Sequence, residues 1–312
     1  MNAPAQPARA DLRICNAAQT AALIDFEALM KALAQAAAEL DAGAIRSPER
    51  LVVPLTGGVL LSMPATANDI AIHKLVNVVP GNAQQGLPTI HGIVTVCDAA
   101  TGRPLVMLDG PEVTGRRTAA VSMLAVRRLL GRTPAEVLLI GTGAQARYHL
   151  ALLGAVCPKS KIWVRGISAA DTEAFCRAAG AVHSQVLPCP TGVPDAAEAV
   201  ITLTTATEPV YGEAARAGRV VVGVGAFKPE MAEIAKTTLD GSALYADDPA
   251  GARHEAGDLL RAGIDWARVR SLGSLLANEP ERGRPAVFKS VGTAAWDLAA
   301  SRVALQALGL AR

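Results

Sequence analysis

The chain has 312 residues, enough for about two domains of ordinary size. Hydrophobic residues make up 51% and charged residues 19%, a composition that excludes an intrinsically disordered chain. The net charge of +2 comes from 30 basic and 28 acidic residues spread along the sequence, so no basic stripe indicates a nucleic-acid partner.

Targeting and redox features favour a cytoplasmic protein. No apolar run approaches the roughly 20 residues that span a bilayer, so we expect no membrane partner. Residues 1–11 contain a single Arg and no apolar segment of the kind a signal peptide needs. The five cysteines show no C-x-x-C spacing and are expected to be free thiols in a reducing compartment. No His, Cys and Asp spacing indicates a metal site.

The first part of the chain is expected to be a helix followed by an antiparallel sheet. Helical spacing of apolar residues predicts a helix over 26–40, with Gly43 just beyond its end. Short apolar runs between glycines and prolines predict strands at 51–55, 58–63, 70–76, 90–97 and 104–108. A long helix is expected from a cap at Thr114 to Leu130, ending at Gly131.

The pattern changes after residue 134. Candidate strands at 137–140, 161–164, 185–187, 199–203 and 219–224 alternate with alanine-rich helical stretches, and 242–246 could add a sixth strand. This alternation predicts a parallel, doubly wound sheet of the Rossmann type. The expected fold class is α/β, with the Rossmann-type domain over residues 117–293 and an α+β domain over residues 1–116. A closing amphipathic helix within 292–310 is expected to pack back on the first domain through residues 294–312.

A glycine-rich turn follows the first candidate strand of the parallel sheet. Residues 136–140 run directly into Gly141-Thr-Gly143-Ala-Gln-Ala146 and then into a helix, which is G-x-G-x-x-A in strand-turn-helix context. Gly141 permits the tight turn, and Gly143 lets the backbone approach a pyrophosphate at the helix N-terminus. The sequence therefore predicts a dinucleotide-binding site, with Ala146 in place of the third glycine.

The end of the next strand bears on which dinucleotide is bound. Arg165 stands there, followed by Ser168, and no acidic residue occurs before Asp171. An acid at this place binds the ribose hydroxyls of NAD, whereas an Arg accommodates the 2′-phosphate of NADP. NADPH is therefore the expected cofactor and NADH the alternative, unless Arg165 is simply a solvated loop residue.

Six segments together resemble the ornithine cyclodeaminase/mu-crystallin family, over nearly the whole chain. They are residues 74–80, 86–89, 115–120, 141–145, 223–229 and 292–297. The resemblance implies a homodimer built through the N-terminal domain, a Rossmann domain for the cofactor, and a site between the two domains. The N-terminal domain would then carry both substrate binding and dimerisation.

The resemblance also implies roles for individual residues. Arg46, Lys74 and Arg117 match positions that hold a substrate carboxylate, and Arg is well suited to grip a carboxylate with two hydrogen bonds. Lys74 is the candidate catalytic proton donor, because desolvation lowers the pKa of a lysine. Arg46 could instead be a loop charge, and Asp297 could either fix the closing helix near the nicotinamide or favour the helix dipole. The motif and the resemblance together give as cofactor contacts Thr89, Arg117, Gly141, Gly143, Ala144, Gln145, Arg165, Ser168, Thr205, Val224, Gly225, Ala226, Phe227, Gly292 and Thr293.

One departure from the family pattern decides the expected reaction. In the cyclodeaminases, the position of Phe227 is an aspartate that acts as acid and base, and phenylalanine has no proton to exchange. Glu230 or Glu233 could replace it only from a shifted place in the loop. The expected activity is therefore NAD(P)H-dependent reduction of a cyclic imino acid, 1-pyrroline-2-carboxylate to L-proline or 1-piperideine-2-carboxylate to L-pipecolate. The alternatives are an alanine dehydrogenase-like amino-acid dehydrogenase and a non-catalytic protein that binds NADPH or a small ligand.

Overall fold

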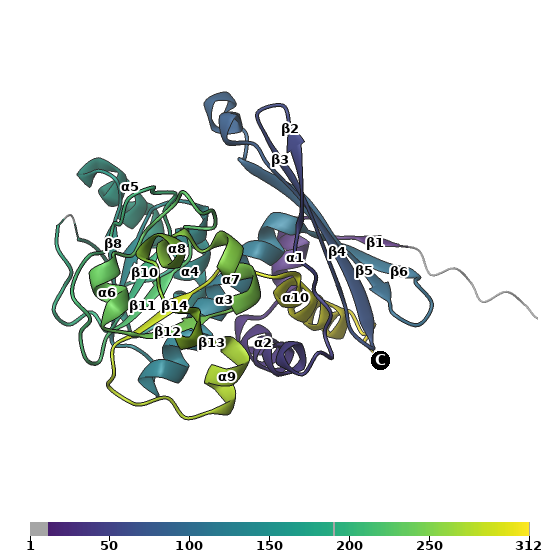
Figure 1. Ribbon diagram of the computed structural model, residues 1–312. Coiled ribbons are helices and arrows are strands. Elements are labelled where there is room, and N and C mark those ends of the chain that lie inside the picture. Colours follow the sequence, from purple (N-terminus) through teal and green to yellow (C-terminus); the bar gives the residue numbers. More distant parts are fainter. Residues whose placement is uncertain (1–11, 190, 312) are drawn as a thin grey trace, which may run out of the picture.

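The computed structural model describes residues 12–189 and 191–311. The expectation that residues 1–11 are not a signal peptide concerns a segment outside the described residues. Two β-sheets lie in two lobes, with helices between them (Figure 1). One lobe holds a six-stranded mixed sheet and the other an eight-stranded parallel sheet. The α/β fold class expected from the sequence is confirmed.

The N-terminal sheet has the strand order β1-β6-β5-β4-β3-β2. All of its neighbours are antiparallel except β1 and β6, which run parallel. The short strand β1 and helix α1 were not expected, because two to seven residues carry too little periodicity to be read. The elements are β1 (Arg13–Ile14), α1 (Ala17–Leu23), α2 (Phe26–Asp41), β2 (Leu51–Leu55), β3 (Gly58–Thr66), β4 (Ile70–Val78), the 3₁₀ helix η1 (Pro80–Gln85), β5 (Ile90–Asp98) and β6 (Pro104–Asp109).

The C-terminal helix α10 (Ala294–Ala307) packs back against α2 and against strands β3 and β4. Side chains alternate along β4, so Ile72, Lys74 and Val76 are all buried on one side of the sheet. Two of these are ordinary core residues and the third is a lysine. The sheet therefore places one cation among apolar neighbours.

Helix α3 (Gly110–Leu130) begins earlier than its sequence suggested. Asp109 caps it by accepting a hydrogen bond from the amide of Glu112 at 2.8 Å, and Pro111 fits the first turn because its φ is already helical. The expected cap at Thr114 is therefore wrong, and Thr114 lies inside the helix. The expected domain boundary at residue 116 falls within this continuous helix.

The parallel sheet has the strand order β13-β12-β14-β11-β10-β7-β8-β9, so the direction in which successive strands are added to the sheet reverses between β7 and β10. The crevice at the carboxyl ends of such strands is where doubly wound sheets bind ligands. The six expected strands are present, and β13 and β14 are additional. The elements are β7 (Glu136–Ile140), α4 (Ala144–Val156), β8 (Lys161–Arg165), α5 (Ala169–Ala179), β9 (Val186–Pro188), β10 (Ala199–Thr202), β11 (Val220–Gly223), α6 (Lys236–Asp240), β12 (Ala243–Ala246), α7 (Pro249–Glu255), α8 (Gly257–Ala262), η2 (Trp266–Arg268), β13 (Val269–Ser271), α9 (Leu272–Ala277) and β14 (Ala286–Lys289).

Candidate active site

A cleft of about 310 Å³ opens where the N-terminal sheet and helix α3 face the carboxyl ends of β7, β10, β11 and β14. One wall is apolar and comes from β3 to β5, and the other consists of loops of the parallel sheet. The lining residues are Arg50, Leu61, Met63, Lys74, Val76, Val78, Ile90, Thr114, Arg117, Thr118, Gly143, Ala144, Gln145, Leu203, Thr204, Thr205, Val224, Gly225, Phe227, Ser290 and Val291.

Three charged side chains meet at the floor of the cleft. The Nζ atom of Lys74, on β4, lies 2.6 Å from Oδ2 of Asp297, in the first turn of α10. The other carboxylate oxygen, Oδ1, lies 3.4 Å from Nε of Arg117 on α3. Lys74 is 2% exposed and Asp297 is 0% exposed. Two cations and one anion leave the floor with one uncompensated positive charge, which is the charge that a substrate carboxylate would neutralise.

The surroundings of Lys74 weaken its hold on the proton. Burial lowers the pKa of Lys74 to about 8, and Asp297 opposes this shift while Arg117 adds to it. The amine is therefore mostly protonated at neutral pH yet able to give up its proton within the ordinary working range of an enzyme.

The third expected carboxylate ligand is not where the sequence suggested. Arg46 is exposed and forms an isolated β-bridge with Thr66, outside the residues that line the cleft. Arg50, four residues later, lines it instead. The guanidinium of Arg50 donates to the carbonyl oxygen of Gly292 at 2.6 Å and pairs with Glu255 at 2.8 Å. Two arginines in one short loop could not be distinguished by residue type alone.

The turn after β7 is shaped for a dinucleotide. Gly141 has φ +124°, and a Cβ there would lie 2.7 Å from the carbonyl oxygen of Leu203, so only glycine fits. Gly143 is the N-cap of α4 and provides no side-chain cap, and a Cβ placed on it would meet nothing within 4 Å. The free amides of this helix N-terminus therefore face open space, as a pyrophosphate requires. The chain fits the expected nicotinamide cofactor.

Two buried polar atoms at the cleft lack partners. Oε1 of Gln145 and Oγ1 of Thr114 have no hydrogen-bond partner among the described residues. A buried, unpaired polar atom is costly unless a ligand or water satisfies it. Gln145 was expected as a cofactor contact. Thr114 was not, and its place one turn before Arg117 on the same helix was the signal that could have indicated it.

One buried carboxylate fixes the loops after β10 and β11 by accepting hydrogen bonds from their backbone amides. Glu233, which is fully buried, accepts hydrogen bonds from the amides of Thr204, Gly225 and Ala226 at 2.6, 2.5 and 3.1 Å. A Cβ at Gly225 would lie 1.8 Å from the carbonyl oxygen of Thr204, so the loops can cross only at a glycine. Both oxygens of Glu233 are occupied by these hydrogen bonds, and Glu230 is exposed. Neither glutamate therefore supplies the acid that is missing at position 227.

The loop after β14 is fixed in a similar way. Asp247, at the end of β12, accepts hydrogen bonds from the amides of Val291 and Gly292, both at 2.9 Å. Gly292 has φ +81°, and a Cβ there would lie 2.7 Å from Nη1 of Arg117. The glycine therefore leaves room for the guanidinium that faces the cleft. The hydroxyl of Thr293 lies 2.7 Å from that of Ser47, which ties α10 to the segment before β2.

Several expected contacts lie beside the cleft rather than on its surface. Arg165, at the end of β8, donates to the carbonyl oxygens of Gly192 and Val210, both at 2.9 Å. Ser168 caps α5 through the amide of Asp171. Of the expected cofactor contacts, the ones outside the lining set are Thr89, Gly141, Arg165, Ser168, Ala226, Gly292 and Thr293.

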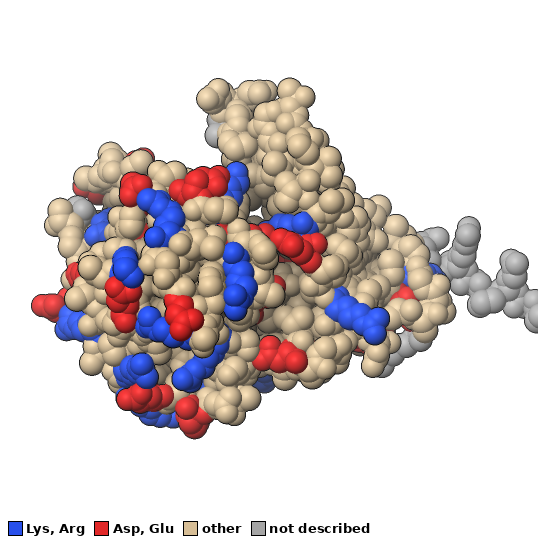
Figure 2. All heavy atoms as spheres, in the orientation of Figure 1, with Lys and Arg blue, Asp and Glu red and all other residues tan. Residues whose placement is uncertain are grey.

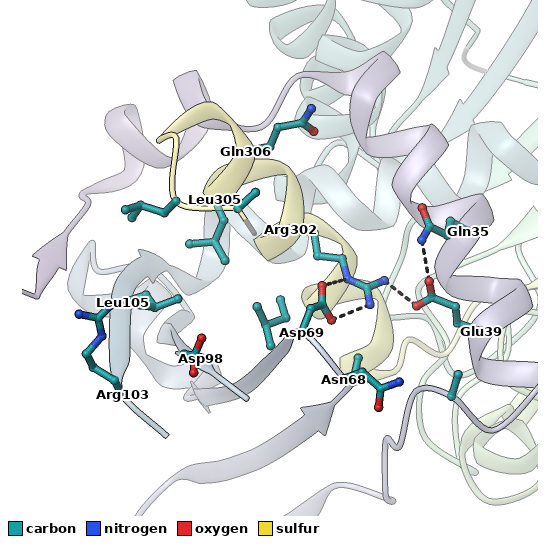
Figure 3. A pocket seen from close by; sticks show the side chains of 15 residues that line it. Gln35, Glu39, Asn68, Asp69, Asp98, Arg103, Leu105, Arg302, Leu305 and Gln306 are labelled. Carbon is teal, nitrogen blue, oxygen red and sulfur yellow. Dashed lines mark hydrogen bonds and ion pairs between the residues drawn. The ribbon is translucent and has the colours of Figure 1, made fainter. Parts of the chain in front are cut away.

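A second hollow, of about 650 Å³, lies between α2, α10 and the far end of the N-terminal sheet. Arg302 crosses it and is paired with Asp69 at 2.8 Å and with Glu39 at 2.6 Å (Figure 3). Its charge is thus already neutralised, and the residue joins α10 to α2 and to the turn before β4. Among all the described residues, no group of acidic, His and Cys side chains could hold a metal ion, and no helix is long and apolar enough to cross a membrane.

Together, a Rossmann-type sheet with an open phosphate-binding turn and a facing unit that supplies buried cations define a two-unit dinucleotide-binding protein. The sequence profile of the Ornithine cyclodeaminase/mu-crystallin family matches residues 11–308, and the chain belongs to that family.

Proteins from several organisms are similar to the chain over nearly its whole length. Delta(1)-pyrroline-2-carboxylate reductase 1 of Burkholderia multivorans is 56% identical over 95% of this chain and 96% of its own. Delta(1)-pyrroline-2-carboxylate/Delta(1)-piperideine-2-carboxylate reductase of Azospirillum brasilense is 54% identical over 96% and 97%. The structure of Thermococcus litoralis Delta(1)-pyrroline-2-carboxylate reductase with NADH and L-proline superposes with a TM-score of 0.83 at 25% identity, covering 96% of this chain and 99% of that one.

Proposed function

We propose that the protein reduces cyclic imino acids, 1-pyrroline-2-carboxylate and 1-piperideine-2-carboxylate, with a nicotinamide cofactor. The observation that carries the proposal is the meeting of Lys74, Asp297 and Arg117 opposite the phosphate-binding turn. The proposal is also supported by relatives that are named for this reaction and whose sequences are 56% and 54% identical to this chain.

Each group of residues in the cleft has a separate role in the reduction. The bound cofactor supplies a hydride to the carbon of the C=N bond. Arg117 and Arg50 hold the substrate carboxylate, and the Lys74 ammonium donates a proton to the nitrogen, so that one C–H and one N–H bond form as the C=N bond is reduced. Leu61 and Met63 from the sheet wall, and Phe227 from the facing loop, pack beside the flat ring and exclude water that would hydrolyse the imine.

The test is a set of initial rates with each of the two cyclic imines, using NADH and NADPH separately. Oxidation of the cofactor by a cyclic imine, with none by pyruvate plus ammonia, is the expected result. Turnover with pyruvate and ammonia alone would favour an amino-acid dehydrogenase. Tight NADPH binding without any turnover would favour a binding protein.

NADPH is proposed as the preferred cofactor because Arg165 stands at the end of β8. We expect Arg165→Asp to shift the ratio of kcat/KM values toward NADH, since it removes a cation and adds an acceptor for the ribose hydroxyls. Arg177→Asp, an exposed change on α5, is the matched control. An unchanged ratio in Arg165→Asp would mean that its bonds to Gly192 and Val210 are its whole role.

Phe227 sets the reaction apart from deaminating cyclisation. The protein is expected to release no ammonia from ornithine, because Phe227 lines the cleft with an apolar ring that has no proton to exchange. Phe227→Asp should slow imine reduction by placing an unpaired carboxylate in a partly dry cleft, whereas Phe227→Leu should retain most of it. Ammonia release by the unmodified protein at a rate comparable to imine reduction would contradict the proposed site.

We also propose that the protein forms a homodimer through the N-terminal sheet. Its free cysteines favour the reducing environment of the cytoplasm as its location. Strand β2 is exposed along its whole length although its sequence is LVVPL, and Figure 2 shows no charged side chain on the outer end of this sheet. An exposed apolar edge of this kind is normally covered by another chain. Mass by light scattering should give two chains for the protein and one for Val52→Lys/Leu60→Lys. A monomeric unmodified protein would refute the dimer.

A further inference from the structure

We propose that Asp297 is the positioning residue of the site: it keeps Lys74 as the protonated donor and aims Arg117 at the substrate carboxylate. The inference rests on the proposed reduction, because it assigns Lys74 the proton that the imine nitrogen receives. It concerns a residue whose sequence position suggested no more than an anchor for the closing helix or a partner for its dipole.

The geometry separates this role from a favourable interaction with the helix dipole. A carboxylate in the first turn of a helix is stabilised there even when it points to solvent. Asp297 instead has no exposed surface, and its two oxygens are shared between Lys74 at 2.6 Å and Arg117 at 3.4 Å. It therefore joins strand β4, helix α3 and helix α10 at one point on the floor of the cleft.

The contact with Arg117 also determines what the guanidinium offers to a ligand. Asp297 engages Nε, and in the described part of the chain Nη1 and Nη2 have no hydrogen-bond acceptor. Gly292 leaves room for these two nitrogens because it carries no side chain. A guanidinium held at one edge presents its other donors in a fixed direction, which suits a carboxylate.

Asp297 also decides the protonation of Lys74, because the other charged groups near the lysine are unfavourable or already paired. Arg117, from α3, and Arg50, from the segment before β2, both disfavour its charge, while Glu255, from α7, is paired with Arg50. Without Asp297, the pKa of Lys74 falls and the amine becomes neutral at a lower pH. The donor would then be lost at neutral pH and restored by acid.

The experiment measures kcat and KM between pH 6 and pH 9 for the unmodified protein and for Asp297→Asn, with 1-pyrroline-2-carboxylate and NADPH. We expect the alkaline fall in kcat of the variant to move by about one pH unit or more toward acid, with a smaller change in KM. The variant should be at least about fivefold slower at pH 8 and within about threefold of the unmodified protein at pH 6. Damage to packing would not be repaired by acid.

Three variants separate the possible outcomes. Ser301→Ala changes another buried polar side chain of α10 and should leave the pH profile unmoved. Adding Asp297→Asn to Lys74→Met should cause no further shift, because no titrating amine remains. Asp297→Ser removes the same charge with a smaller side chain, and thermal unfolding shows whether each variant folds.

A second measurement does not depend on turnover. Pyrrole-2-carboxylate, a flat carboxylate that accepts no hydride, can be titrated calorimetrically in buffers of different ionisation enthalpy. Its affinity for the unmodified protein should depend on the protonation of Lys74, whose pKa is about 8. In Asp297→Asn this pH dependence of binding should move toward acid.

Two results would overturn the proposal. One is an alkaline limb that stays in place in a folded Asp297→Asn, and the other is loss of folding in both charge-removing variants, which would give Asp297 a purely structural role. A failure of the unmodified protein to reduce either imine would instead refute the proposed function.

Discussion

Replacing Lys74 with Met is expected to reduce kcat/KM for imine reduction by two to four orders of magnitude, the usual contribution of a positioned general acid (~10²- to 10⁴-fold). Methionine has a similar length and fills the buried site, but it donates no proton and leaves Asp297 paired with Arg117 alone. Stopped-flow or steady-state rates with each cyclic imine measure the loss. Lys31→Met, an exposed change on α2, is the control.

The same lysine should set the pH dependence of the unmodified protein. Burial lowers the pKa of Lys74 to about 8, and only the protonated form can donate. The rate should therefore be highest below this pKa and fall as the pH rises through about 8. A rate of Lys74→Met within tenfold of the unmodified protein, with the alkaline fall still present, would place the proton donor elsewhere.

Replacing Arg117 with Ala is expected to cost about 3 kcal/mol of transition-state stabilisation, roughly two orders of magnitude in kcat/KM, as when one partner of a desolvated charge pair is lost. The substrate carboxylate would lose its fixed donors, and Asp297 would lose one of its two partners. The effect should be larger in kcat/KM than in stability, and steady-state rates combined with thermal unfolding separate the two.

The neighbouring arginine provides a matched control for this prediction. Arg116 points the other way on α3, where it pairs with Glu112 at 2.7 Å and stacks over Phe26. Arg116→Ala should lower stability but leave kcat/KM of the folded protein nearly unchanged. If the two variants lost activity equally, the carboxylate clamp would need to be reassigned.

Periodicity and a short motif were sufficient to predict the Rossmann-type sheet and the turn from Gly141 to Ala146, because both depend on neighbours in the chain. Lys74 and Arg117 were expected from the resemblance to the family alone. The missed strand β14 has only four residues and ends in a lysine whose charge is cancelled by Asp258, a partner distant in sequence. Such pairing leaves no local pattern.

The site residues that were not predicted also depend on contacts between parts of the chain that are distant in sequence. Arg50 could not be preferred to Arg46 until the fold showed which one meets Gly292 across the cleft. The roles of Glu233 and Asp247 depend on amides of loops that lie side by side only after the parallel sheet has formed. Residue type showed that these groups were acidic, and only tertiary contacts showed what they hold.

The return of α10 to the first sheet has a consequence for how the chain matures during synthesis. Strands β3 and β4 leave the ribosome early, but the helix that covers them and carries the partner of Lys74 comes after the entire parallel-sheet unit. Until that helix arrives, an apolar sheet face with an embedded amine is exposed to other nascent chains and to chaperones. The N-terminal unit therefore completes its fold only after the parallel-sheet unit has been synthesised.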